Sequence, residues 1–257
     1  MKTYLEERIE YHDKEYRAGR ALISDTQFDN LEKNLKRIDP KCDYFNKKNN
    51  LILPSLPKNQ IHEFLNNLLP TTKLLIQPKI DGCAIAIKYI DGKLDSAINR
   101  KGHDISRKIE EVKDVPKEIK VRSRFVVRGE LFAPEERPSY SQRIASRYLR
   151  SRDYQPNPKI SFCAFQIINT RTNEYDSLVY LREMGFTIPE IIEANRTSQV
   201  ETFIQAWKFD NLFAKYPTDG IVVKINSRKL QLLREKSYGV YPHWQMAIKD
   251  KSDIIDN

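Results

Sequence analysis

The sequence is poor in cysteine and has no apolar run long enough to cross a membrane. Its three cysteines, Cys42, Cys83 and Cys163, are widely spaced and form no CxxC pair, which argues against a disulfide framework and against a zinc site. The four histidines are scattered and fall in no metal-binding motif. No stretch approaches the roughly 18 apolar residues of a membrane helix. The residues after Met1 include no apolar signal-peptide region, so we expect a cytoplasmic protein.

The rest of the composition is that of a globular protein with an excess of positive charge. Of 257 residues, 40% are hydrophobic and 31% are charged, which is enough for a core in one large or two modest domains. Lysine and arginine number 44 against 35 acidic residues, for a net charge of +9. Such an excess suits a polyanionic partner, most commonly a nucleic-acid backbone. Many basic proteins bind no nucleic acid, so the charge alone does not identify the partner.

Up to about residue 45, apolar residues recur at helical spacing. Leu5, Ile9 and Tyr16 predict one helix. A second helix is expected to begin at Ser24 or Asp25 as N-cap and to end before Pro40, because the residue preceding a proline avoids the helical region. Residues 1–45 are therefore interpreted as a small helical domain, and residues 51–257 as a second domain after a polar linker.

From residue 51 onward, short strands separated by turn residues predominate. Asp91-Gly92 is a strong hairpin signal between two of them. The expected strands are 74–76, 83–89, 94–99, 125–132, 160–168 and 220–225, and the expected helices are 61–68, 138–150, 177–184 and 200–211. The fold class is α+β, mainly antiparallel, with a helical unit in front.

One lysine is notable because apolar runs flank it on both sides. Lys79 is followed by Asp81-Gly82, and the pattern predicts two short strands joined by a tight turn. The lysine would lie at the lip of a sheet, above an apolar floor and near a carboxylate. Such surroundings favour the neutral, nucleophilic form of an amine. A simple hairpin with one exposed lysine would produce the same pattern.

Five short segments share a design in which a strand end presents a charged or aromatic group. They are Lys79-Ile80-Asp81-Gly82, Arg128-Gly129-Glu130, Phe162 to Phe165, Asp219 to Lys224, and Trp244 to Lys249. Taken singly, each has a simpler structural explanation, such as a surface ion pair, a core aromatic ring or a solvated strand end. In this order and spacing they resemble the motifs of the covalent nucleotidyltransferases: DNA ligases, RNA ligases and mRNA capping enzymes. The resemblance covers nearly the whole chain and implies an ATP-grasp-like nucleotidyltransferase domain.

The resemblance assigns a role to each charged residue. Lys79 would attack the α-phosphate of a nucleotide and form a phosphoramidate. Lys224 and Lys249 would stabilise the charge that grows on the phosphate oxygens. Asp81 or Glu130 would deprotonate the lysine or hold Mg²⁺, with Glu130 as the expected metal ligand.

Other residues would bind the nucleotide itself. Phe165 and Val222 suit an adenine face, and Arg100 and Arg128 suit a ribose or a phosphate. Gln77 stands where the family commonly has a glutamate that contacts adenine, so it keeps an acceptor and loses the charge. The full set of expected nucleotide contacts is Ser55, Leu56, Gln77, Arg100, Arg128, Glu130, Phe165 and Val222.

The start of the chain narrows the donor to NAD⁺. The segments 11–16 and 23–31 resemble the N-terminal cap of the NAD⁺-dependent bacterial-type DNA ligases, in which an aromatic-rich helix precedes an I-S-D-x-x-Y-D-x-L segment. The resemblance implies that residues 1–45 bind the nicotinamide mononucleotide half of NAD⁺ through Tyr16, Arg17, Asp25, Phe28 and Asp29. Here Phe28 replaces the usual tyrosine, and Arg17 replaces a histidine.

The sequence also departs from that family. The residues after Arg100 and those from 140 to 150 match its motifs only in part, which leaves the contacts with the nick open. Full-length members continue into an OB-fold, a four-cysteine zinc module, helix-hairpin-helix repeats and usually a BRCT domain. Either this sequence is one part of a longer protein, or the other modules lie on a second polypeptide.

We therefore expect the adenylation portion of an NAD⁺-dependent DNA ligase, an enzyme of DNA replication and repair. It would form the enzyme-adenylate and need an OB-fold partner to seal nicked double-stranded DNA. Two rival interpretations remain. One is an ATP- or GTP-using enzyme such as an RNA ligase or capping enzyme, and the other is a catalytically silent DNA-binding subunit.

Overall fold

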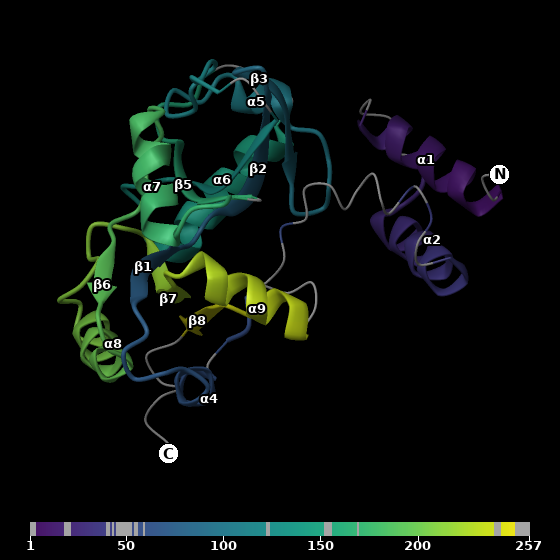
Figure 1. The fold of residues 1–257 in the computed structure, drawn as a ribbon. Helices are drawn as coiled ribbons and strands as arrows, with labels where there is room; N and C mark the ends of the chain where they lie inside the picture. The colour runs from purple at the N-terminus through teal and green to yellow at the C-terminus, as the bar shows by residue number, and fades with distance from the viewer. Residues whose placement is uncertain are drawn as a thin grey trace. The chain divides into compact units, whose positions relative to one another are not determined.

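The computed structural model of the chain, drawn in Figure 1, describes most of the sequence. The described residues are 4–17, 22–39, 42, 44, 53, 56–58, 60–121, 124–151, 156–168, 170–238 and 243–249, without the side chains of 13–17, 25, 26, 29, 32, 33, 36 and 235–238. The chain forms two compact units. The first comprises Met1–Ile52 with Lys101–Asp104, and the second comprises Leu53–Arg100 with Ile105–Asn257. Within the described ranges, no helix is long and apolar enough to span a membrane.

The described residues of the first unit include the helices α1 (Tyr4–Arg17) and α2 (Asp25–Ile38). Of the two candidate N-caps, Ser24 is the one used. Its Oγ accepts a hydrogen bond from the Gln27 amide at 3.3 Å, and the Ser24 amide donates to Gln27 Oε1 at 2.9 Å. This capping box satisfies two backbone donors of the first turn. A small apolar core of Ile9, Leu35, Cys42 and Tyr44 holds the unit together.

The second unit contains two four-stranded sheets, and every strand pairing within them is antiparallel. The first sheet has the order β6-β1-β7-β8, with β6 (Ile192–Ala194), β1 (Leu74–Ile80), β7 (Thr218–Ile225) and β8 (Gln245–Lys249). The second has the order β3-β2-β4-β5, with β3 (Lys93–Asn99), β2 (Cys83–Ile90), β4 (Phe125–Phe132) and β5 (Ser161–Ile167). The expected α+β class and its antiparallel character are confirmed.

Helices cover one face of each sheet. They are α4 (Ile61–Asn66), α5 (Ser106–Ile109), α6 (Pro138–Arg150), α7 (Glu174–Glu183), α8 (Val200–Lys208) and α9 (Arg228–Tyr238), with a short 3-10 helix at Thr197–Gln199. The pattern predicts the first turn of α7 at residue 177, and the helix in fact begins three residues earlier. The patterns do not predict β6, α5 or α9.

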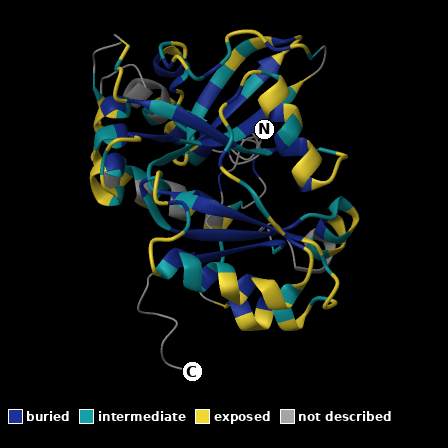
Figure 2. Cartoon of the chain, turned by 90° about the vertical axis from the view of Figure 1, so that its left-hand side faces the viewer, coloured by how far each residue is buried: buried dark blue, intermediate teal, exposed yellow. Residues whose placement is uncertain are grey.

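Each sheet buries the apolar residues that recur at every second position of its strands. In the first sheet, Ile76, Val223 and Ile248 join Phe64 of α4 and Trp207 of α8 in one apolar cluster. Because side chains alternate along a strand, the opposite face is left to residues such as Gln77, Lys79 and Lys224. Figure 2 shows the buried positions concentrated on the strands.

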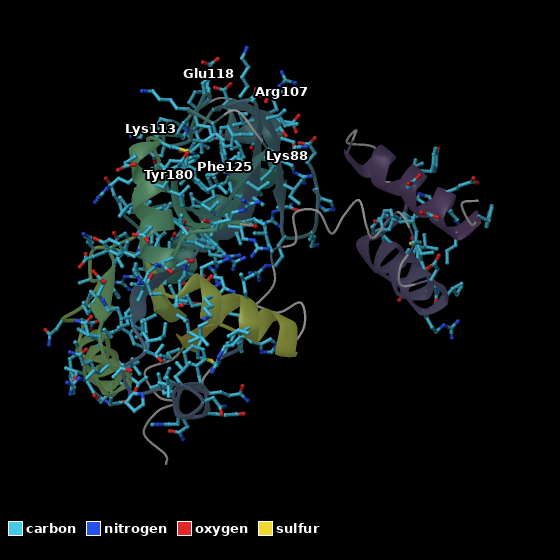
Figure 3. All side chains as sticks on the ribbon, viewed as in Figure 1. Lys88, Arg107, Lys113, Glu118, Phe125 and Tyr180 are labelled. Carbon is cyan, nitrogen blue, oxygen red and sulfur yellow. The ribbon has the colours of Figure 1, made fainter. Side chains whose placement is uncertain are left out.

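The second sheet follows the same rule. Ile85, Ile87 and Val127 pack with residues of α6 and α7 in a second cluster. At one end of that cluster the Phe125 and Tyr180 rings meet edge to face, with centroids 6.2 Å apart (Figure 3). This contact helps to hold α7 along the sheet.

The connection after Lys79 is not a hairpin. β1 pairs with β6 and β7, whereas β2 pairs with β3 and β4, so residues 81 and 82 link one sheet to the other. The two strands are where the sequence predicts them, but the predicted pairing is wrong, because alternation of apolar residues sets the buried face of a strand and not its partner. By contrast, Asp91-Gly92 does close a hairpin, with left-handed φ angles of 50° and 83°.

Gly82 is needed for close packing against β4 and not for a left-handed turn. Its φ is not left-handed. A Cβ at this position would lie 2.2 Å from the carbonyl oxygen of Leu131, closer than any real contact. Glycine is therefore required because the link between the sheets passes directly against β4.

Candidate functional site

Two lysines meet on one carboxylate at the edge of the first sheet. Lys79 Nζ lies 2.7 Å from Asp219 Oδ1, and Lys249 Nζ lies 2.5 Å from Asp219 Oδ2. Lys79, Gly220 and Lys249 are cross-strand partners in a single row over β1, β7 and β8. All three charged side chains are partly exposed, at 23% for Lys79, 19% for Asp219 and 38% for Lys249. A ligand can therefore reach the cluster.

A β-bulge aims Asp219 at the lysines. Lys79 pairs with Gly220 but Ile80 pairs with Thr218, so Asp219 is an extra residue on β7. In a regular strand Asp219 and Gly220 would point to opposite faces. A bulge redirects the side chain of the extra residue, and here it brings the Asp219 carboxylate to the side of the lysines. Thr218 Oγ1 donates to the Lys79 carbonyl oxygen at 2.9 Å and ties the bulge to β1.

Gly220 allows β8 to approach at this point. A Cβ on Gly220 would lie 2.2 Å from the carbonyl oxygen of Ile248. The absence of a side chain between Lys79 and Lys249 lets both ammonium groups converge on Asp219. The Asp-Gly pair of β7 is thus a geometric requirement of the cluster as well as a source of charge.

Two further carboxylates belong to the same electrostatic site. Burial raises the pKa of Asp81, and repulsion by Asp219 raises it further, against the lowering effect of Lys79 and Lys249. On β4 of the other sheet, burial raises the pKa of Glu130 to about 8, although Lys79 and Arg100 act to lower it. The hydrogen bond to Asp219 raises the pKa of Lys249. Residues from both sheets therefore share one charged centre.

Asp81 and Glu130 could hold Mg²⁺ only if waters and substrate phosphates supply the remaining oxygen ligands. Within the described ranges, no group of three or more His, Cys, Asp or Glu side chains is arranged to hold a metal ion. Mg²⁺ commonly binds through one or two carboxylates, with waters and substrate phosphates completing its shell. Burial is the main cause of the raised pKa values of Asp81 and Glu130, and repulsion by neighbouring carboxylates adds to it; a bound cation would oppose both effects. These two side chains fit such a site.

Gln77 and Val222 form the next row of the same sheet face. They are cross-strand partners, and Gln77 is two residues before Lys79 on β1. The Gln77 side chain is 2% exposed and its Nε2 has no hydrogen-bond partner. Buried amides are nearly always hydrogen-bonded, so this one is suited to meet an acceptor on a ligand.

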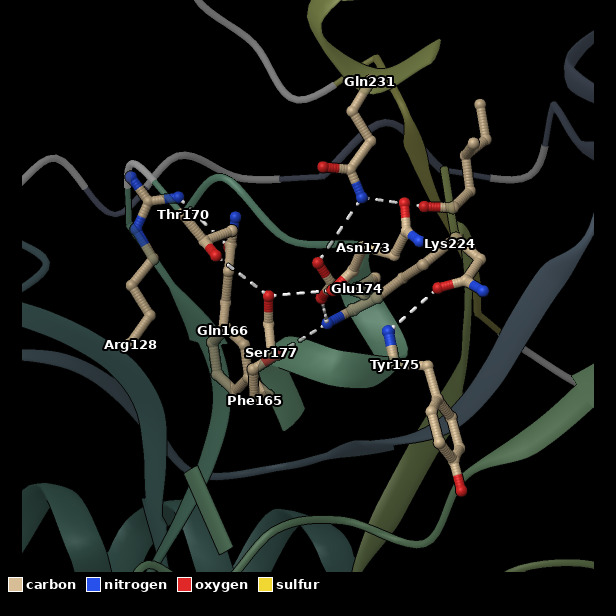
Figure 4. A network of polar contacts seen from close by, with 12 residues as sticks. Arg128, Phe165, Gln166, Thr170, Asn173, Glu174, Tyr175, Ser177, Lys224 and Gln231 are labelled. Atoms are coloured by element: carbon tan, nitrogen blue, oxygen red, sulfur yellow. Dashed lines mark hydrogen bonds and ion pairs between the residues drawn. The ribbon is translucent and has the colours of Figure 1, made fainter. Parts of the chain in front are cut away.

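Lys224 does not join the lysine cluster. Its cross-strand partner is Leu75, four residues before Lys79, a separation of about 13 Å along the strand. The amine is buried and donates to Glu174 Oε1 at 2.9 Å and to the Phe165 carbonyl oxygen at 2.6 Å (Figure 4). In this structure the Lys224 amine is bound by Glu174 and by the Phe165 carbonyl, and its predicted place beside the reacting phosphate remains a prediction.

Of the other predicted contacts, Arg100 acts electrostatically on Glu130, and Arg128 lies two residues before Glu130 on β4. Arg128 Nη1 donates to Gln166 Oε1 at 3.3 Å, Arg100 is exposed, and Leu56 is half-buried. Phe28 packs on the small core of the first unit, which is sufficient to explain an aromatic ring there.

Several predicted residues lie outside what the structure describes. They are Ser55 and the side chains of Tyr16, Arg17, Asp25 and Asp29. Their expected contacts with the nicotinamide mononucleotide half of NAD⁺ remain predictions.

No pattern in the sequence indicates that Asp219 and Glu174 would each bind a lysine of the motifs. Asp219 stands in the Asp-Gly motif, yet nothing in the sequence marks the bulge that turns it toward Lys79. Glu174 precedes the helix start that the pattern predicts and carries no motif signal. Both were found only through the strand register and the hydrogen bonds.

Comparison with known proteins finds similarity to DNA ligases. Residues 57–144 match the family model described as the NAD-dependent DNA ligase adenylation domain. The chain is 27% identical over 307 residues to the DNA ligase of Petrotoga mobilis, covering 97% of the chain and 45% of that protein. It is 27% identical over 224 residues to the DNA ligase of Metamycoplasma arthritidis, covering 75% of the chain and 33% of that protein. The chain thus spans less than half the length of these relatives.

Solved structures show the same fold at low sequence identity. An archaeal ATP-dependent RNA ligase superposes with a TM-score of 0.51 and 13% identity, covering 77% of this chain and 48% of that one. The structure named Pmar-Lig_Pre gives a TM-score of 0.55 and 12% identity, covering 90% of this chain and 52% of that one. The expected nucleotidyltransferase fold and the resemblance to the NAD⁺-dependent ligases are confirmed.

The raised pKa of Glu130 predicts a pH-dependent stability in the absence of ligand. Between its ordinary value of 4.5 and about 8, the folded state keeps a proton that the unfolded state has lost. The free energy of unfolding should therefore fall with rising pH, by up to ~1.4 kcal/mol per pH unit. Glu130→Gln is neutral throughout and should lack this contribution.

Urea unfolding of both proteins from about pH 5 to pH 8 measures the effect, because other titrating groups cancel in the difference. The stability of the wild type relative to the variant should decline as pH rises. A difference that does not change with pH would contradict the burial of this carboxyl group.

Proposed function

We propose that this chain, which is similar to the adenylation portion of the NAD⁺-dependent DNA ligases, forms a covalent lysyl-AMP on Lys79 with NAD⁺ as the adenylyl donor. The observation that carries the proposal is the meeting of Lys79 and Lys249 on Asp219, within the electrostatic reach of Glu130. A nucleophile, a base at hydrogen-bond distance and a second fixed cation are the parts that covalent nucleotidyl transfer requires.

The first event is loss of a proton from Lys79. Asp219 Oδ1, at 2.7 Å, is the carboxylate oxygen in position to accept it. The freed lone pair on Lys79 Nζ forms a bond to the adenylyl phosphorus. The bond from that phosphorus to the bridging oxygen breaks, and its electron pair leaves with nicotinamide mononucleotide.

Charge on the phosphate is met by fixed cations. Lys249 lies on the same carboxylate as the nucleophile, so its ammonium is placed to stabilise the non-bridging oxygens as their charge grows. Asp81 and Glu130 are the residues that would hold Mg²⁺. When bound, that ion screens phosphate charge and orients the leaving group.

The nucleoside extends from Lys79 along the same sheet face. The row of Gln77 and Val222 lies two residues from the Lys79 row, about 7 Å along the strand, which suits a base joined to the phosphate through a ribose. Phe165 and Arg128 supply an aromatic ring and a cation from the second sheet. The first unit would bind the nicotinamide half of NAD⁺ through the cap residues predicted from the sequence.

The rival donors are distinguished by intact-mass measurement after incubation with Mg²⁺ and NAD⁺, ATP or GTP. We expect a shift of one AMP with NAD⁺ alone. The Lys79→Ala variant should show no adduct, because the nucleophile is gone. Lys88→Ala removes a lysine from a distant ion pair with Asp95 and should leave the adduct unchanged. An adduct with ATP or GTP would indicate the other nucleotidyltransferases, and no adduct at all would indicate a silent subunit.

Removal of the shared carboxylate should slow adenylation. In Asp219→Asn the amide cannot accept a proton from Lys79 or pair with Lys249, so we expect the rate at saturating NAD⁺ to fall about 100-fold or more. Asp95→Asn disrupts a comparable lysine–aspartate pair elsewhere, at 2.5 Å, and should retain the wild-type rate. Equal rates for the two variants would contradict the role given to Asp219.

The proposed substrate of the complete reaction is nicked double-stranded DNA. The net charge of +9 favours attraction to a phosphate backbone, but such binding weakens steeply with salt. Since the chain spans only part of its relatives, we propose that sealing also needs an OB-fold and other DNA-binding modules, carried by a second polypeptide or a longer chain. A cytoplasmic location remains a prediction of the sequence.

A nick-sealing assay tests the need for further modules. The purified chain should form the adenylate but show little joining of a nicked duplex, because we expect this chain alone to hold the DNA only weakly at moderate salt. Addition of an OB-fold protein of the ligase type should increase joining. Efficient sealing by the chain alone would contradict the requirement for a partner.

A further inference from the structure

A buried ion pair joins the two sheets away from the lysine cluster. The side chains of Lys224 on β7 and Glu174 on α7 are each 2% exposed, with Nζ and Oε1 2.9 Å apart. The same Lys224 amine donates to the carbonyl oxygen of Phe165 on β5 at 2.6 Å (Figure 4). One ammonium group therefore connects β7, β5 and α7.

Phe165 depends on this connection because it lies in a strand bulge. Arg128 pairs with Gln166, but Gly129 pairs with Ala164, so Phe165 is an extra residue on β5. The extra residue of a bulge is left out of the regular ladder of hydrogen bonds. The Phe165 side chain is half-buried and belongs to neither of the two main apolar clusters. Lys224, whose amine also lies 5.6 Å from the centre of the Phe165 ring, is thus a principal constraint on this residue.

Glu174 is itself fixed from several directions. Its amide donates to the Asn226 carbonyl oxygen at 2.9 Å, at the end of β7. Gln231 Nε2 on α9 lies 3.4 Å from Glu174 Oε2 and donates to the Ile225 carbonyl oxygen at 2.8 Å. The carboxylate is therefore held rigidly beneath Lys224. A buried ammonium needs such a partner, because without one it loses its proton or moves toward water.

We propose that Glu174 is a positioning residue for nucleotide binding. Through Lys224 it fixes the bulge at Phe165, and so holds the aromatic ring where the base of the nucleotide binds. Glu174 touches neither the nucleotide nor the reacting atoms. The inference rests on the proposed function, since it assigns Phe165 to the adenine subsite.

The test is the dependence of lysyl-AMP formation on NAD⁺ concentration in Glu174→Gln. The substitution keeps the shape of the side chain and removes its charge, which weakens the hold on Lys224. We expect KM for NAD⁺ to rise about tenfold while the maximal rate stays within about twofold, as for a lost binding interaction. The pH profile of the maximal rate should not change, because the Lys79–Asp219 pair is untouched. Glu190→Gln, which breaks an exposed pair with Lys215, should leave KM unchanged.

A double-mutant cycle distinguishes positioning from a general loss of stability. If Glu174 acts through Phe165, then Glu174→Gln should add little to KM in a Phe165→Leu background, because residues acting as a unit are not additive. Additive effects, or a fall in maximal rate with KM unchanged, would overturn the proposal. If Glu174→Gln does not fold, Glu174→Asp keeps the charge at a shifted position. It should raise KM less, again only when Phe165 is present, and an unchanged KM would likewise overturn the proposal.

The two proposals fail in different ways. If wild-type protein forms no lysyl-AMP from NAD⁺, the proposed function is wrong. If the wild type forms it and Glu174→Gln does so with the same KM, only the role of Glu174 is wrong.

Discussion

The site depends on a single carboxylate shared by two ammonium groups. Asp219 binds Lys79 at 2.7 Å and Lys249 at 2.5 Å, and it can do so only because a bulge turns it to their side of the sheet. Without Asp219, the two lysines of this row would repel each other, and a regular strand would point the carboxylate away from them. The local irregularity in β7 is therefore as important to the site as the charges.

The same arrangement explains why buried and reactive residues alternate along these strands. Ile76, Ile221 and Val223 are buried among helices on one face, while Gln77 and Lys79 line the other. The helices cover one side of the sheet, and the second side carries polar groups together with apolar residues such as Leu75 and Val222. The second sheet adds Glu130 to the centre, where burial raises its pKa to about 8 against the lowering effect of Lys79 and Arg100.

The second sheet has a similar bulge at Phe165, on β5. In each case an extra residue leaves the regular ladder and a lysine binds near it. At Asp219 the lysines bind the side chain, whereas at Phe165 the lysine binds the backbone. The charge of Lys224 is balanced in this structure by Glu174, a residue that no motif indicates.

The sequence by itself determined most of the strand positions, the fold class and the hairpin at Asp91-Gly92, and it singled out Lys79 as the candidate nucleophile. These follow from local patterns, since the period of apolar residues and the turn preference of Asp-Gly act over a few neighbours. Only the tertiary structure decided that β1 and β2 belong to different sheets, that Asp219 faces Lys79, and that Lys224 pairs with Glu174. Each of these depends on which strand lies beside which and in what register. Pairing partners are chosen by contacts between distant segments, and alternation along one strand carries no information about them.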